Sequence, residues 1–253
     1  MAVRSRSIAV VVTVALGIVA QSSQAAAPTR RSKRAPRYKA VELKETGTIE
    51  GEVIFKGTIP APRKLAVTIK DAVCTQHAIV DETLVVSKDG KVRNAVISLD
   101  GLASGKPFPS HGKYVLDQKG CVFRPHVVVV PPREELTVLN SDGILHNVHS
   151  RSLLNREFNK AMPGMVKEMK VKFRRAERIA VQCDAHNWMS AWIVVAQNPY
   201  CVVSDPEGVF RLEQVPPGTH TITLWHEKLG TRKQSVTVEP GKTAKIQFVL
   251  QRK

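Results

Sequence analysis

The sequence contains few cysteines, few acidic residues and no apolar run long enough to span a membrane. Four of its 253 residues are cysteine, and 22 acidic residues stand against 38 basic ones. The apolar stretch at residues 8–20 is shorter than the roughly 20 residues that a spanning helix requires. Cys74 lies in Cys-Thr-Gln-His, which lacks the second cysteine of a c-type haem attachment. These absences argue against a membrane-spanning segment and against haem attachment at Cys74.

Residues 1–25 contain the basic, apolar and small-residue parts of a secretory signal peptide in the usual order. Arg4 and Arg6 precede the apolar stretch, and the small-residue exit Ser-Gln-Ala follows it and ends at Ala25. A membrane anchor is the alternative, and no cysteine follows the stretch as a site for lipid attachment. We expect a mature chain that begins near Ala26 and is located in the periplasm or secreted.

Positive charge is concentrated just after this segment. The formal net charge is +16, and residues 29–44 hold seven basic side chains against Glu42. These residues include Pro36 and lack apolar periodicity, so they predict a flexible arm. Export excludes nucleic acid as the partner, which leaves an anionic envelope surface or an acidic redox protein. A linker without a specific partner is the alternative.

Four side chains have the residue types and the order of a blue copper site. His146 comes first, and the loop Cys-Asp-Ala-His-Asn-Trp-Met then supplies Cys183, His186 and Met189. A thiolate, two imidazoles and a weak axial thioether suit copper, because soft sulfur favours Cu(I) and imidazole tolerates both oxidation states. The alternative is a chance grouping of residues that are each common in protein interiors. Their joint order and spacing favour the copper site.

The neighbouring sequence predicts that these ligands emerge beside strand ends. Ile179, Val181 and Cys183 alternate with Arg178, Ala180 and Gln182, which is the period of a half-buried strand whose sulfur faces the core. Two apolar runs that flank residues 131–133 predict a pair of strands, the second of which leads to His146. A rigid β-sandwich with ligands in its loops keeps the metal geometry fixed, which favours electron transfer.

The runs Leu-His-Asn-Val-His at residues 145–149 and Val-Gln-Cys-Asp-Ala-His-Asn-Trp-Met at residues 181–189 resemble those of small cupredoxins, the amicyanins above all. In that family the same two-residue gaps separate the cysteine, histidine and methionine ligands. The resemblance covers residues 116–198 and implies a Greek-key β-sandwich with one type 1 copper. By this resemblance the copper ligands are His146, Cys183, His186 and Met189. Asn147 is then the residue that braces the two ligand loops by hydrogen bonding.

Two β-rich pieces flank this region. Residues 204–225 resemble the turn, strand and Pro-Gly turn of carboxypeptidase-regulatory-like, transthyretin-type sandwiches. The predicted all-β organisation is a signal peptide (1–25), a basic linker (26–45), an N-terminal β-rich region (46–115), the cupredoxin-like domain (116–198) and the carboxypeptidase-regulatory-like region (199–253). The last piece is short for its fold, so strands from residues 46–70 are an alternative source of its missing strands. The copper domain is an insertion in that case.

If Cys183 binds copper, three cysteines remain: Cys74, Cys121 and Cys201. In an oxidising compartment, such cysteines can form disulfides. At most one disulfide then forms, and Cys74 with Cys121 is the pair that we favour. Whether His149 or His226 joins a second metal site stays open, because neither has tightly spaced partner ligands.

The predicted function is that of an exported one-electron carrier, not an enzyme, which exchanges electrons with an acidic redox protein such as a c-type cytochrome or a dehydrogenase. The alternative is a non-redox copper-binding or envelope scaffold protein, for which Met162, Met165 and Met169 are candidate soft ligands. Trp188 predicts an exposed apolar docking patch from which the edge of the His186 ring emerges. Lysines at positions 160, 167, 170 and 172 are predicted to steer the acidic partner.

Overall fold

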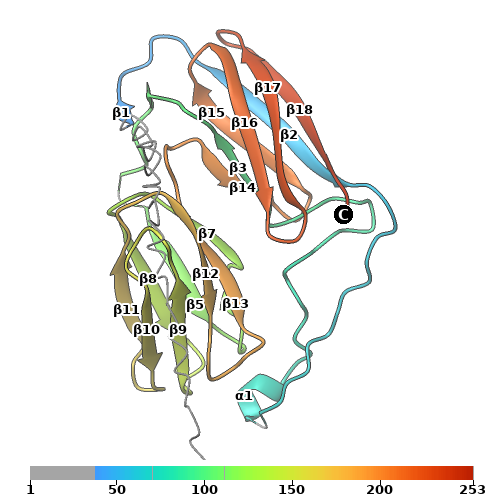
Figure 1. Cartoon of the computed structure of the whole chain (residues 1–253), viewed down its shortest axis with the longest axis vertical. Helices are drawn as coiled ribbons and strands as arrows, with labels where there is room; N and C mark the ends of the chain where they lie inside the picture. Colours follow the sequence, from blue (N-terminus) through green and yellow to red (C-terminus); the bar gives the residue numbers. More distant parts are fainter. Residues whose placement is uncertain (1–37, 70, 111, 253) are drawn as a thin grey trace, which may run out of the picture. The chain divides into compact units, whose positions relative to one another are not determined.

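The computed structural model describes residues 38–252 except 70 and 111, and these residues form strands with a single short helix, α1 (Ala72–Thr75) (Figure 1). The predicted all-β class is confirmed. The signal peptide expected at residues 1–25 and most of the basic arm lie outside the described residues. Within the described part of the chain, no helix is long and apolar enough to cross a membrane.

The region around the predicted ligands forms a sandwich of two sheets, which we call the first sandwich. Its sheets have the strand orders β10-β9-β12-β13-β7 and β11-β8-β5-β6. The strands are β5 (Tyr114–Gln118), β6 (Phe123–Arg124), β7 (Val127–Val130), β8 (Glu135–Asn140), β9 (His146–Arg151), β10 (Phe158–Met162), β11 (Glu168–Lys172), β12 (Glu177–Gln182) and β13 (Ser190–Val195). Leu116, Val138, Ile179 and Ile193 are fully buried between the sheets. The alternation predicted before Cys183 is therefore present in β12.

A second sandwich combines strands from both ends of the chain. Its strands are β2 (Gly47–Phe55), β3 (Val96–Leu99), β14 (Cys201–Val203), β15 (Val209–Val215), β16 (Gly218–His226), β17 (Gly230–Val238) and β18 (Thr243–Leu250). Its sheets have the orders β14-β3-β16-β17 and β15-β2-β18, so β2 and β3 lie inside sheets whose other strands are C-terminal. The division into separate regions at 46–115 and 199–253 is therefore wrong, because the C-terminal strands need these two partners. The first sandwich is inserted between β3 and β14.

The basic linker also ends earlier than expected. Strand β1 (Lys39–Ala40) pairs in parallel with β4 (Ser104–Gly105). Tyr38 packs against the core of the second sandwich and donates its hydroxyl hydrogen to the carbonyl oxygen of Lys106 at 2.7 Å. The predicted flexible linker thus extends at most to residue 37, because Tyr38 supplies the apolar ring that anchors the chain.

Residues 56–95, which we call the β2–β3 connection, leave the second sandwich, pack against the core of the first over residues 65–79, and return to the core of the second at Val92 and Ala95. Cys74 and Ile79 are buried in that core, and Leu65, Val67 and Val73 pack against it. Cys74 forms a disulfide with Cys121 in the β5–β6 turn, so the favoured pairing is confirmed. Among the described residues, Cys183 and Cys201 are the free cysteines.

Candidate metal centre

The paired strands bring the two predicted ligand segments together. His146 is the first residue of β9, Cys183 directly follows β12, and Met189 directly precedes β13. Strand β12 pairs with both β9 and β13, so the ends of these three strands are neighbours. None of the four predicted ligands is more than 4% exposed. The site therefore lies inside the protein at one end of this sheet.

Three predicted donor atoms converge. One nitrogen each of His146 and His186 and the sulfur of Cys183 lie within 4.8 Å of one another. The two Nδ1 atoms of His146 and His186 are 3.0 Å apart, and Nδ1 of His186 is 3.6 Å from Sγ of Cys183. Met189 is 1% exposed, and its backbone N–H donates to the carbonyl oxygen of His186 at 2.9 Å. This bond folds the ligand loop back on itself.

Asn147 connects the two ligand segments. Its side-chain oxygen accepts hydrogen bonds from the backbone N–H groups of Asp184 at 2.6 Å and Ala185 at 3.1 Å. Its own backbone N–H donates to Sγ of Cys183 at 3.4 Å. Asn147, which follows the predicted ligand His146, thus holds the turn that follows the predicted ligand Cys183. This is the bracing role that the cupredoxin resemblance implies.

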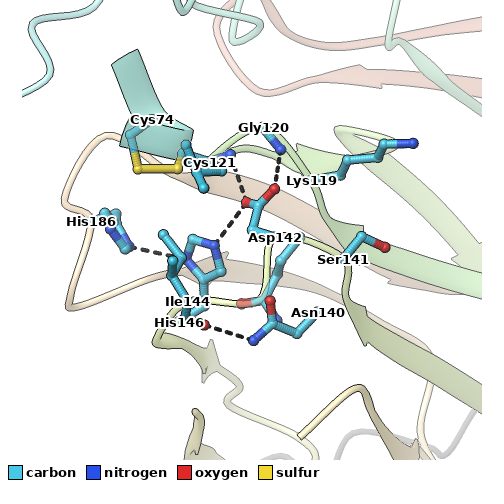
Figure 2. A network of polar contacts seen from close by, with 12 residues as sticks. Cys74, Lys119, Gly120, Cys121, Asn140, Ser141, Asp142, Ile144, His146 and His186 are labelled. Carbon is cyan, nitrogen blue, oxygen red and sulfur yellow. Dashed lines mark hydrogen bonds and ion pairs between the residues drawn. A yellow bond between two sulfur atoms is a disulfide. The ribbon is translucent and has the colours of Figure 1, made fainter. Parts of the chain in front are cut away.

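Asp142 orients His146 from the other side (Figure 2). Its carboxylate accepts the N–H of Gly120 at 2.6 Å and that of Cys121 at 2.8 Å, and lies 2.9 Å from Nε2 of His146. A carboxylate at Nε2 keeps the proton there and leaves Nδ1 as the donor atom for a metal. Sequence reasoning missed Asp142, although an acidic residue in the turn four positions before a ligand histidine was the available signal.

The charges within the site favour a cysteine thiolate. Burial raises the pKa of Cys183, but hydrogen bonds with His146 and with the backbone N–H of Asn147 outweigh burial and lower it. Burial also opposes the charge on His146, yet the hydrogen bonds to Asp142 and Cys183 raise its pKa to about 9. Burial and the neighbouring His146 lower the pKa of His186. Both downward shifts favour the thiolate of Cys183 and the neutral imidazole of His186, which are the forms that bind metals.

The edge of His186 is covered, contrary to the expected exposed patch. His186 is 4% exposed, and one ring nitrogen lies within 4.8 Å of both sulfurs of the Cys74–Cys121 disulfide (Figure 2). Trp188 is partly buried and donates its indole N–H to the carbonyl oxygen of Cys121 at 3.0 Å. The covering residues belong to the β2–β3 connection and the β5–β6 turn, both far from the ligand loop in sequence.

The other candidate residues do not join this site. His149 lies 2.9 Å from Asp184 and 3.2 Å from Glu157, and His226 is 1% exposed and accepts the N–H of Lys228. Neither histidine belongs to a cluster of potential metal ligands within residues 38–252, leaving aside 70 and 111. The candidate soft ligands differ in environment, because Met162 is fully buried whereas Met165 is 87% exposed.

Comparison with known proteins identifies one part of the chain by sequence. Residues 190–251 match the family model of the carboxypeptidase regulatory-like domain, which covers β13 and the C-terminal strands of the second sandwich. No curated protein matches the chain.

Solved structures of copper proteins resemble part of the chain. A purple cupredoxin from Nitrosopumilus maritimus is 16% identical over 33% of this chain and 100% of its own, with a TM-score of 0.29. A Cu(I) structure of an amicyanin mutant is 22% identical over 40% of this chain and 98% of its own, with a TM-score of 0.30. A copper-containing nitrite reductase from Thermus scotoductus is 15% identical over 36% of this chain and 25% of its own, with a TM-score of 0.31. At these values the likenesses carry no functional argument, so the metal centre is inferred from its donor atoms.

Proposed function

We propose that this chain is an exported type 1 copper protein that carries one electron at a time between redox partners and is not an enzyme. The observation that carries the proposal is the convergence of three buried donor atoms, from His146, Cys183 and His186, within 4.8 Å. One thiolate with two imidazoles is a donor set that copper prefers, and buried Met189 stands in the loop position of a weak axial ligand.

The surroundings of the donors support an electron carrier. Copper, when bound, supplies a one-electron couple between Cu(I) and Cu(II). Asn147 and Asp142 hold the ligand segments through hydrogen bonds, which limits the movement that a change of oxidation state causes. Because none of the four ligands is more than 4% exposed, a substrate has no direct approach to the donors. Both features favour electron transfer over bond-making chemistry.

Copper loading tests this proposal. We expect one copper per chain and an intense thiolate-to-Cu(II) charge-transfer band that reductant removes and oxidant restores. Cys183→Ser is expected to abolish the band, whereas Cys201→Ser, which replaces the other free cysteine, is expected to keep it. A colourless protein, or one that binds several coppers, would instead favour the non-redox copper-binding function.

The location and the partner are parts of the same proposal. The basic, apolar and small-residue parts of residues 1–25 support export to the periplasm or outside the cell. After cleavage, the N-terminus is then near Ala26. The excess of basic side chains supports an acidic redox partner, such as a c-type cytochrome or a dehydrogenase. N-terminal sequencing of the protein from its native host tests export, and an intact Met1 in the cytoplasmic fraction would contradict it.

A further inference from the structure

A groove of about 850 Å³ lies along β10 and β11, which are the end strands of the two sheets of the first sandwich. Each of these strands pairs on one side only, β10 with β9 and β11 with β8. Phe158 and Phe173 line the groove, with ring centroids 6.4 Å apart. Phe173 is 2% exposed, so the feature of this groove that accepts an extended peptide is its pair of free strand edges.

The groove is strongly basic. Glu157 is its one acidic residue, against six basic residues: Arg156, Lys160, Lys170, Lys172, Arg174 and Arg175. All six are exposed. Lys170 and Lys172 share the single carboxylate of Glu135, at 2.9 and 3.8 Å. Within the described part of the chain, the other four form no ion pair, so the groove keeps a positive charge that an acidic ligand complements.

A chain of hydrogen bonds fixes the arginine-bearing wall of the groove. The side-chain oxygen of Asn155 accepts the backbone N–H groups of Arg174 at 2.8 Å and Arg175 at 2.9 Å. The carboxylate of Glu177 in turn accepts both the backbone and the side-chain N–H of Asn155, at 3.1 and 2.9 Å. These bonds hold the backbone that carries two of the six cations before any ligand arrives, which lowers the entropy cost of binding.

The groove is also connected to the candidate metal centre. Asn159 of β10 lines it and accepts a hydrogen bond from the side-chain amide of Asn147 at 2.6 Å. Asn147 in turn donates its backbone N–H to Sγ of Cys183. Two side chains therefore link the thiolate to the groove, whereas the edge of His186 lies beneath the disulfide.

We propose that this groove docks an acidic, extended segment of the redox partner and that the electron leaves Cys183 through Asn147 and Asn159. The inference rests on the proposed electron-carrier function and gives it a docking surface other than the one expected at Trp188. Transfer converts Cu(I) to Cu(II) and reduces the acceptor by one electron, and the partner supplies that acceptor.

Peptide binding to the metal-free protein tests the groove independently of copper. The probe is a fluorescent oligoglutamate peptide, measured by anisotropy at low salt. Lys160→Glu with Arg174→Glu is expected to weaken binding about tenfold or more, because two attractions become repulsions. The matched control is Lys88→Glu with Lys245→Glu, which changes total charge equally at two exposed positions outside the first sandwich. Equal affinities of the two double variants would overturn the docking site. Tighter binding of polyphosphate than of the peptide would overturn the peptide as occupant.

Electron transfer tests the exit route in the copper-loaded protein. Hexacyanoferrate(III) is a small anionic oxidant that the groove is expected to attract. Asn159→Ala is expected to slow its reduction several-fold with the charge-transfer band retained, whereas Trp188→Lys is expected not to slow it. The opposite pattern would place the exit at His186 and refute the Asn159 route. Failure of the wild-type protein to show the copper band would refute the proposed function, and the peptide experiment would still decide whether the groove binds acidic chains.

Discussion

Removal of the Cys74–Cys121 disulfide tests how the metal centre is covered. The two cysteines are 47 residues apart in sequence, and the chain-entropy relation for a loop of that length gives about 4 kcal/mol of stabilisation. Cys74→Ser with Cys121→Ser is therefore expected to lower the free energy of unfolding by up to about 4 kcal/mol. Guanidinium chloride unfolding of the metal-free protein, without reductant, measures this loss.

The same variant is expected to uncover His186. The disulfide sulfurs lie beside its ring, and the turn that carries Cys121 also accepts the Trp188 indole hydrogen. Modification of His186 by diethyl pyrocarbonate, followed by peptide mapping, is expected to be faster in the double variant than in the wild-type protein. Cys201→Ser is the control, because it removes a cysteine that forms no disulfide. A loss of less than about 1 kcal/mol together with an unreactive His186 would show that packing alone holds the β2–β3 connection, and our reasoning would be refuted.

Three further predictions concern single side chains. Asp142→Asn is expected to reduce copper affinity about 10- to 100-fold, measured by competition with a chelator, because Nε2 of His146 loses its anionic partner. Met189→Leu is expected to keep the charge-transfer band and raise the reduction potential, measured by voltammetry, because an axial thioether tunes the potential. Glu177→Gln is expected to destabilise the metal-free protein by about 1–2 kcal/mol at neutral pH, because Glu177 accepts several hydrogen bonds as a carboxylate. Its pKa is lowered from 4.5 to about 2, since hydrogen bonds from Ser152 and Leu153 outweigh burial. The difference between wild type and variant should therefore be complete above pH 4.5 and vanish as pH falls through 2 in urea unfolding. A constant difference across that range would exclude the ionised carboxylate as its source.

The predicted ligand residues could be grouped from sequence because their signals are local. Cys183, His186 and Met189 lie within seven residues, and the strand before them shows its period in the chain itself. His146 was predicted because the run His-Asn-Val-His at residues 146–149 resembles that of amicyanins. The three donor atoms that the structure brings together are all among these predicted residues.

The features that sequence reasoning missed depend on contacts between distant segments. Asp142 is an ordinary turn residue until the N–H groups of Gly120 and Cys121 converge on its carboxylate. The cover over His186 comes from residues more than 60 positions away, and no pattern in the ligand loop indicates it. Pairing of β2 with β18 joins opposite ends of the chain, and only the shortness of the C-terminal piece pointed to it.

The insertion of the first sandwich has a consequence for the order of folding. The last sheet strand of the second sandwich before the insertion ends at Leu99 and the next begins at Cys201, and the side chain of Asn198 donates to the carbonyl oxygen of Leu99 at 2.8 Å. A hydrogen bond thus joins the two places where the chain passes between the sandwiches. Insertion of one domain into another requires these two places to lie close together. Strand β2 must wait for β15 and β18, whereas every strand of the first sandwich precedes residue 196. During N-to-C emergence of the chain, we expect the first sandwich to fold first and the second to close last, with β2 needing protection from aggregation in the interval.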